Sequence, residues 1–87
     1  MRNLRMMRIR VRLFAFLREA AGRGEAELRL PPGATAEQAW QELAAEHPAL
    51  APSRPGLMAS VNRRYATFET VLAEGDEVVF IPPVSGG

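Results

Sequence analysis

The chain has 87 residues, of which 47% are hydrophobic and 24% charged, and its formal net charge at pH 7 is +1. This length and apolar content predict one small folded domain with a single core and argue against disorder. No apolar run approaches the roughly 20 residues of a membrane span, and the polar start MRNLRMMRIR is unlike a secretory signal, so we expect a cytoplasmic protein with no membrane partner.

The residue inventory excludes most side-chain catalysis. The chain has no cysteine, one histidine, His47, and one aspartate, Asp76, so we expect no disulfide, no thiol catalysis and no metal site. A Ser-His-Asp triad would have to use His47 and Asp76, and nothing in the sequence supports one. All eleven basic residues are arginine, which excludes Schiff-base chemistry by a lysine. Any chemistry must therefore use something other than side chains.

Two strands joined by a helical turn are predicted first. Polar and apolar residues alternate over 8–13, as in a strand with one buried face. By the same parity Phe14 lies off the core face, although it is large and apolar. Residues 17–22 favour a short helical turn that ends at Gly22, and residues 25–30 alternate again, so we expect an antiparallel pair. The inward set of the first strand is Ile9, Val11 and Leu13, and the outward set is Arg8, Arg10 and Arg12.

A helix follows. Thr35 and Gln38 have the spacing of a capping box, and the helix is expected to end at His47 because Pro48 disfavours helical geometry in the residue before it. Trp40 is the largest residue of the apolar stripe and is expected to lie across the sheet. The stripe consists of Ala36, Ala39, Trp40, Leu43 and Ala44.

The last third of the chain predicts three more strands. Residues 48–56 contain three prolines and a glycine and are interpreted as a stiff surface loop. Strands are expected over 57–61, 65–68 (a short edge strand) and 78–81, with a turn at 62–64. Val71 and Leu72 are expected to pack under the turn before the last strand. This order predicts an α+β fold of the β-grasp type, a mixed sheet of about five strands with one main helix packed across it and the first and last strands parallel in its centre. We assign 1–81 to one domain and 82–87 to a projecting tail.

The tail ends in Gly86-Gly87. A glycine pair alone can be a frayed terminus, but this pair follows the last strand behind Pro82-Pro83, which favours extended geometry. Residues 82–87 reach at most about 20 Å, and glycine lets the end enter a narrow site. The only reactive group offered is the carboxylate of Gly87, which must be activated, most simply as an acyl-adenylate, before it can form an amide or a thiocarboxylate.

At this point the sequence resembles the ubiquitin-like sulfur carriers, and among them the small subunits of molybdopterin synthase. The resemblance covers residues 8–87 and rests mainly on GDEVVFIPPVSGG at 75–87, with support from LFAFLREAAG at 13–22 and from Val61-Asn62. Residues 1–7 depart from the pattern and are interpreted as an N-terminal extension.

The resemblance implies a carrier that has no catalytic side chains and binds no cofactor. An E1-like enzyme would use ATP to adenylate Gly87, and a sulfur donor protein would convert it to a thiocarboxylate. The tail would then enter the large subunit of molybdopterin synthase and give sulfur to cyclic pyranopterin monophosphate, which becomes molybdopterin. The family suggests a heterotetramer, a dimer of heterodimers. Gly86 and Gly87 would be the reacting end, and Pro82, Pro83, Val84 and Ser85 the spacer that enters the partner.

A docking surface is expected beside the tail. Phe14 and Ile81 end the first and last strands, so a β-grasp fold places both at the tail's exit, with Tyr65 as a third member. In the resembling family these positions match hydrophobic residues that contact partners; the alternative is that loops or the short helix cover them. Arg18 matches a charged position of the family and is expected either to pair across the interface or to be solvated.

Other interpretations stay open. Within the same fold, an alternative is a carrier for tRNA thiolation, thiamin or cysteine synthesis. A ubiquitin-like modifier would join Gly87 to lysines of target proteins, and a plain β-grasp interaction module would have an inert tail. The stripe of Arg8, Arg10 and Arg12 does not predict a nucleic-acid partner, because ten acidic residues balance the charge and no stacking aromatics are interleaved.

Overall fold

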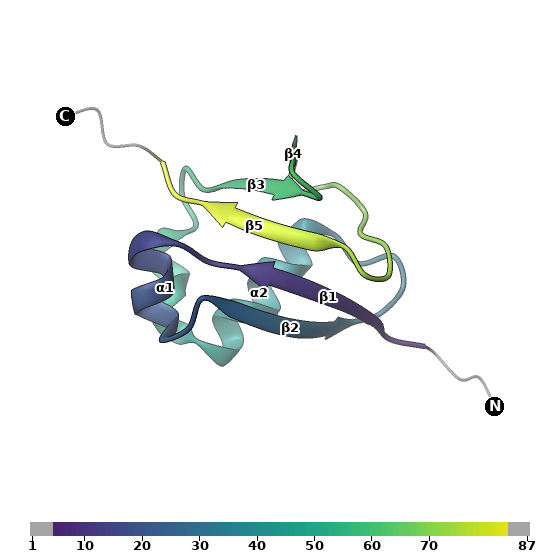
Figure 1. Cartoon of the computed structure of the whole chain (residues 1–87), viewed down its shortest axis with the longest axis horizontal. Coiled ribbons are helices and arrows are strands. Elements are labelled where there is room, and N and C mark those ends of the chain that lie inside the picture. Colours follow the sequence, from purple (N-terminus) through teal and green to yellow (C-terminus); the bar gives the residue numbers. More distant parts are fainter. Residues whose placement is uncertain (1–4, 84–87) are drawn as a thin grey trace.

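The computed structural model describes residues 5–83, which form one five-stranded sheet in the order β2-β1-β5-β3-β4 (Figure 1). β1 and β5 are parallel in the centre, and the other neighbouring strands are antiparallel. The expected α+β arrangement of the β-grasp type is confirmed. The strands are β1 (Met7–Arg12), β2 (Glu25–Leu30), β3 (Met58–Val61), β4 (Arg64–Ala66) and β5 (Glu77–Ile81).

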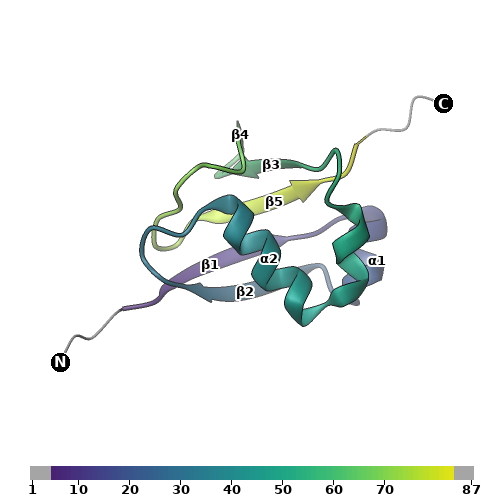
Figure 2. The same ribbon diagram turned by 180° about the vertical axis from the view of Figure 1, so that it is seen from behind.

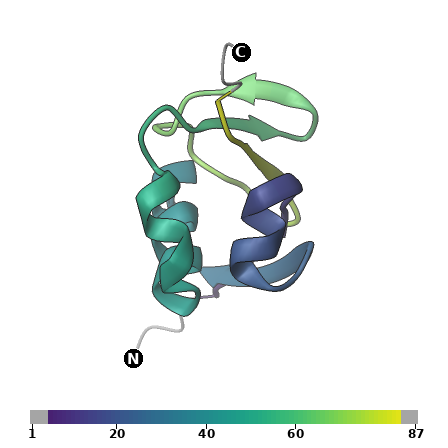
Figure 3. The same ribbon diagram turned by 90° about the vertical axis from the view of Figure 1, so that its left-hand side faces the viewer.

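Helices cover one face of the sheet and leave the other open. α2 (Ala36–Glu46) crosses that face (Figure 2), and η1 (Pro48–Ser53), a 3₁₀ helix, follows it directly. α1 (Ala15–Ala21) lies at the end of the sheet where β1 ends (Figures 1 and 3). No helix within residues 5–83 has the length and apolar content needed to cross a membrane.

The start and end of α2 follow the local sequence. The backbone N–H of Gln38 donates to Thr35 Oγ1 at 3.3 Å, and the backbone N–H of Thr35 donates to Gln38 Oε1 at 2.9 Å. This is the expected capping box, and it satisfies helix N–H groups that have no partner within the helix. His47 has non-helical φ and ψ of −132° and 79° and ends the helix before Pro48, as expected.

The core is centred on Phe80 of β5. Its ring meets Trp40 edge to face at a centroid distance of 5.1 Å and stacks on Phe68 at 5.9 Å. Trp40 is 2% exposed, so its role as the large helix anchor is confirmed. Burying a ring of this size is worth about 3–5 kcal/mol in large-to-small substitutions. The expected inward residues of β1, namely Ile9, Val11 and Leu13, are all buried.

Several boundaries differ from the sequence expectation. Met7 is buried and pairs with Leu30, so the first strand includes a residue that had been assigned to the N-terminal extension. The stretch interpreted as a surface loop forms η1 and buries Leu50 completely. Pro48 stands at the start of η1, where proline is tolerated, and Pro52 lies inside it. The short helix begins at Ala15, whose φ of 53° turns the chain sharply out of β1.

Val71 is a further correction. Its side chain is 62% exposed, whereas Leu72 is buried, so only one of the two packs under the turn. Val71 forms an isolated antiparallel bridge with Thr35. Because successive side chains of extended backbone point to opposite sides, burying Leu72 turns Val71 outward.

The only aspartate of the chain fixes the entry to β5. One carboxylate oxygen of Asp76 accepts from Asn62 Nδ2 and the other from the backbone N–H of Ala73, both at 2.8 Å. Asn62 in turn accepts from the backbone N–H of Glu77 at 3.0 Å. These bonds tie the β3–β4 turn to the start of β5, and they use the carboxylate for structure.

An ion pair joins the end of η1 to α2 and to the loop after β4. The Nε of Arg54 lies 3.1 Å from Glu37 Oε1, and its guanidinium carbon lies 3.7 Å from the centre of the Phe68 ring. The hydrogen bonds from Arg54 hold the pKa of Glu37 below its usual range, against the effect of partial burial. Stacking on Phe68 keeps the guanidinium in place.

We expect Glu37→Gln to lower the free energy of unfolding at pH 7 by about 0.5–1 kcal/mol, the range for a partly exposed ion pair. A carboxyl whose pKa is lowered by folding stabilises the fold fully above its unfolded pKa, and this contribution is lost as the pH falls through the folded value. The difference between wild type and Glu37→Gln, measured by urea unfolding, should therefore shrink below about pH 4.

Glu42→Gln is the matched control, because Glu42 is an exposed residue of the same helix with no side-chain hydrogen bond or ion pair to any residue in 5–83. An equal loss of stability in the two variants would show that the Arg54 pair does not stabilise the fold.

Candidate functional site

The open face of the sheet is the candidate site, and its two halves differ in chemistry. Alternation along the strands leaves every second side chain on this face. On β1 and β2 these side chains are charged, and on β3, β4 and β5 they are mostly apolar. We define the charged half as Arg8, Arg10, Arg12, Glu25, Glu27 and Arg29, and the apolar half as Met58, Tyr65, Val79 and Ile81.

The strand register brings the apolar half together. Met58 is directly opposite Ile81, and Ser60 lies between Val79 and Tyr65 in the ladder. Met58 is 46% exposed and Tyr65 74% exposed, while Val79 and Ile81 are half-buried. Large apolar side chains that face water in one group are typical of a surface that binds another protein.

Phe14 extends this surface beyond β1. It caps α1 in an extended conformation and is 48% exposed, so the short helix does not cover it. Arg12 of β1 is paired with Val79 of β5 in the parallel ladder. Phe14 and Ile81 follow two residues later, each after its own member of this pair. Both residues therefore lie at the end of the sheet from which the tail leaves, as expected from the sequence.

Arg12 marks the border between the two halves. Its guanidinium lies 5.6 Å from the centre of the Phe14 ring, and it forms long ion pairs of 3.8 Å with Glu25 and 3.9 Å with Glu77. The cation thus lies between a carboxylate of β2 and one of β5, at distances longer than a hydrogen bond, and its Nε has no hydrogen-bond partner within residues 5–83. Its guanidinium lies over the face of the Phe14 ring, the arrangement of a cation–π contact.

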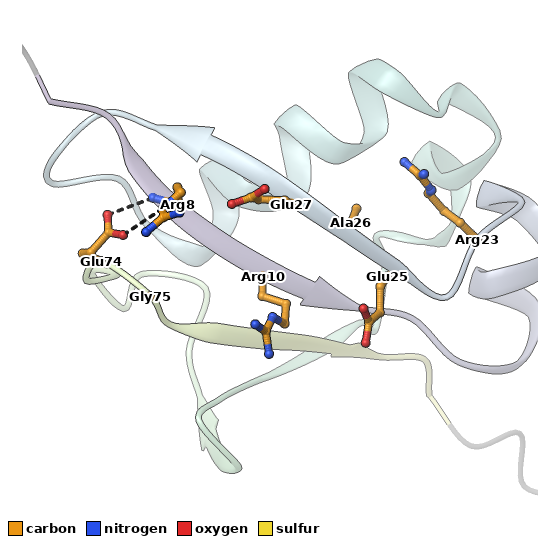
Figure 4. A pocket seen from close by; sticks show the side chains of 8 residues that line it. All are labelled: Arg8, Arg10, Arg23, Glu25, Ala26, Glu27, Glu74 and Gly75. Carbon is orange, nitrogen blue, oxygen red and sulfur yellow. Dashed lines mark hydrogen bonds and ion pairs between the residues drawn. The ribbon is translucent and has the colours of Figure 1, made fainter.

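The charged half holds an open depression of about 650 Å³ (Figure 4). Three arginines and three glutamates line it, and the Nε of Arg8 is 3.4 Å from Glu74. The backbone N–H of Arg8, followed by its guanidinium, lowers the pKa of Glu74 from its usual range. A lining of balanced charges with little apolar surface is unlike a small-molecule site. The depression is lined by Arg8, Arg10, Arg23, Glu25, Ala26, Glu27, Glu74 and Gly75.

Arg18 lies apart from the apolar half. It is exposed on α1, and its side chain covers Gly24, where a β-carbon would come within 3.3 Å of its Nε. Gly24 precedes β2, on the side of β1 away from β5. The structure thus places Arg18 beside the other edge of the sheet, and its interface role stays a prediction.

The tail is described only at its root. Pro82 is half-buried and Pro83 is exposed. Val84, Ser85, Gly86 and Gly87 lie outside the described residues, so their expected roles stay predictions. Among residues 5–83, no group of three or more histidine, cysteine, aspartate or glutamate side chains could hold a metal ion.

Sequence reasoning missed Met58 and Val79. Met58 alternates with the buried Leu57 and Ala59, a signal that was present in the strand pattern. Its position opposite Ile81 depends on long-range strand register, which local alternation does not encode.

Comparisons with known proteins identify the family of the chain. The sequence model of the ThiS family matches residues 11–87. The "Molybdopterin synthase sulfur carrier subunit" of Escherichia coli K12 is 40% identical over 81 residues, which are 91% of this chain and 99% of that protein.

Solved structures share the fold. The small archaeal modifier protein 1 of H. volcanii has a TM-score of 0.84 and 28% identity and covers 90% of this chain and 99% of its own. A chain in the complex of subunits 1 and 2 of the molybdopterin-converting factor of Helicobacter pylori has a TM-score of 0.62 and 20% identity, with 93% of this chain and 100% of that chain covered. At that identity the likeness shows the fold alone.

We expect Phe14→Ala to change the free energy of unfolding by less than about 1 kcal/mol, because the ring is half exposed. Leu13→Ala, one residue earlier, should cost about 2–5 kcal/mol because Leu13 is buried in the core. Denaturant unfolding of both variants measures the difference. Similar losses in the two variants would place Phe14 in the core and remove it from the site.

Proposed function

Because this chain belongs to the ThiS family, we propose that it is the sulfur carrier subunit of a molybdopterin synthase. The relative from Escherichia coli, which bears that name, aligns with nearly the whole chain. The observation that carries the proposal is the placement of Phe14, the apolar half and the root of the tail at one end of the sheet. A partner that binds this surface receives the tail beside it.

The proposed chemistry takes place at the carboxylate of Gly87. An E1-like enzyme joins it to the AMP portion of ATP and releases pyrophosphate. Sulfur at the sulfide level (HS⁻), supplied by a donor protein, then displaces AMP to give a thiocarboxylate. The carrier supplies no catalytic side chain and no bound cofactor, and acts as a sulfur-donating co-substrate. This division of labour is compatible with a chain that has neither cysteine nor lysine.

The proposed partner for sulfur delivery is the large subunit of molybdopterin synthase. There the thiocarboxylate would give its sulfur to cyclic pyranopterin monophosphate, which after two such deliveries becomes molybdopterin. The relative from Escherichia coli, 40% identical, is named as a subunit of the synthase, which supports an assembly with a second subunit. We propose a cytoplasmic heterotetramer in which Pro82, Pro83, Val84 and Ser85 span the entrance to the partner's site.

A second candidate is a ubiquitin-like modifier. The likeness to the small archaeal modifier protein 1 of H. volcanii, at 28% identity, favours it. In that case the activated Gly87 would form an amide with lysines of target proteins. Carriers for tRNA thiolation, thiamin or cysteine synthesis would form the same thiocarboxylate and differ only in the protein that accepts it.

The proposed function predicts a thiocarboxylate at Gly87. Intact-mass measurement of the protein from its native host, grown under conditions that require molybdenum cofactor, should show one carboxyl oxygen replaced by sulfur. Deletion of Gly87 should abolish this species and leave the melting temperature nearly unchanged, because the terminal glycine belongs to the tail and not to the core. Exclusively unmodified protein would contradict the carrier, and conjugates on target lysines would favour the modifier.

The proposed function also predicts where the large subunit docks. Phe14→Asp should weaken binding to the large subunit by at least about tenfold, the effect of losing one anchor residue of an interface. Val71→Asp is the matched control, since Val71 is 62% exposed but bridges to Thr35 at the start of α2, outside the open face. Calorimetric titration measures both affinities. Equal affinities for Phe14→Asp and Val71→Asp would exclude the open face as the docking surface.

A further inference from the structure

The root of the tail lies beside the turn that leads into β3. A β-carbon added to Gly56 would lie 3.3 Å from Cγ of Pro83, 3.6 Å from its Cβ and 3.9 Å from its Cδ. A side chain at position 56 would therefore meet the proline ring at closer than ordinary packing distance, and the ring would have to shift by a few tenths of an ångström to admit it.

Gly56 belongs to a tight turn that leads into β3. The N–H of Leu57 donates to the carbonyl of Arg54 at 3.0 Å, Pro55 is the second residue, and Gly56 has a φ of 78°. These are the features of a type II turn, in which the third residue needs a left-handed φ. The turn hydrogen bond and Pro55 fix the position of Gly56.

The strand register explains why Pro83 meets Gly56. Met58 is opposite Ile81 in the antiparallel ladder of β3 and β5, and counting two residues outward along both strands aligns Gly56 with Pro83. Proline has no N–H to continue the ladder. Beyond Ile81 no ladder hydrogen bond can therefore be donated by residues 82 and 83. The neighbouring feature that remains is the packing of the Pro83 ring against the position of a β-carbon at Gly56.

We propose that Gly56 is the positioning residue that sets the direction in which the tail leaves the domain. This inference rests on the proposed function. Four residues follow Pro83, a length of at most about 14 Å, so the direction taken at the proline limits the region that the reacting carboxylate can reach. Displacement of a reacting group by about 1 Å can lower a rate by up to a hundredfold.

The chain contains a matched control for the strain that substitution of Gly56 would introduce. Gly33 occupies the same place in another Pro-Gly turn, in which the N–H of Ala34 donates to the carbonyl of Pro31 at 3.1 Å. Its φ is 89°, and a β-carbon there would meet nothing within 4 Å. Gly33 follows the end of β2 that pairs with Met7, at the opposite end of the sheet from Pro83.

The experiment compares Gly56→Ala with Gly33→Ala, each converted to the thiocarboxylate and mixed with the large subunit in single-turnover sulfur transfer. Both variants should lower the melting temperature by similar amounts, since both force alanine into a left-handed conformation. Only Gly56→Ala should lower the rate at saturating large subunit, by about tenfold. Its half-saturating concentration should stay within about twofold, because the docking surface is intact.

A second substitution tests the contact itself. Pro83→Ala removes Cγ, the ring atom that the new β-carbon would approach most closely, together with Cδ, and keeps only Cβ at 3.6 Å, an ordinary packing distance. Adding Gly56→Ala to Pro83→Ala should therefore cause no further loss of rate. Gly56→Asn and Gly33→Asn repeat the comparison with less backbone strain, because asparagine tolerates a left-handed φ better than alanine does. In the isolated wild-type protein, NMR should show a nuclear Overhauser effect between the α-protons of Gly56 and the ring of Pro83.

The outcomes separate this proposal from the proposed function. Wild-type transfer with equal rates for Gly56→Ala and Gly33→Ala overturns the role of Gly56 alone, as does absence of the Overhauser effect. A wild-type chain that accepts and delivers no sulfur overturns the proposed function, and the role of Gly56 in transfer falls with it.

Discussion

The parallel pairing of β1 with β5 is the constraint on which the rest of the structure depends. It spans only three residue pairs, from Arg10 with Glu77 to Arg12 with Val79. Parallel neighbours cannot be joined by a hairpin, so the chain between them must cross over, and that crossover contains α2. The same pairing puts the last residues of both strands at one end of the sheet. Phe14 and the root of the tail are neighbours for that reason, although 67 positions separate Phe14 from Ile81 in the sequence.

The central strand β5 serves two surfaces at once. Val78 and Phe80 are fully buried in the core, whereas Val79 and Ile81 alternate with them and remain half-buried on the open face. A strand in the middle of a sheet with one solvated face usually alternates apolar with polar residues. Here the outward residues near the tail stay apolar, while those of β1 are arginines. The exposed apolar area lies where the tail leaves, and the polar residues cover the part of the sheet that is farther away.

Features encoded within a few residues were predictable from the sequence, and features encoded by register were not. The alternation around Val11 and the capping box at Thr35 are local, and the structure confirms both. The pairing of Met58 with Ile81 and the contact of Gly56 with Pro83 depend on how distant strands align. Local pattern also failed where a constraint came from the tertiary fold. The proline-rich stretch after α2 forms η1 because Leu50 can enter the core, which composition alone does not reveal.

Within residues 5–83 the fold does not pair the one histidine of the chain with its one aspartate. Both carboxylate oxygens of Asp76 accept hydrogen bonds that hold the β3–β4 turn against β5. His47 ends α2, and its buried Nε2 has no hydrogen-bond partner within residues 5–83, so it forms no pair with Asp76 there. In a Ser-His-Asp triad the histidine is oriented by such a pair, so the arrangement that these two residues would have to form is not assembled within residues 5–83. Under the proposed function the domain contributes positioning: the open face binds the partner, and Pro83, packed beside Gly56, directs the tail.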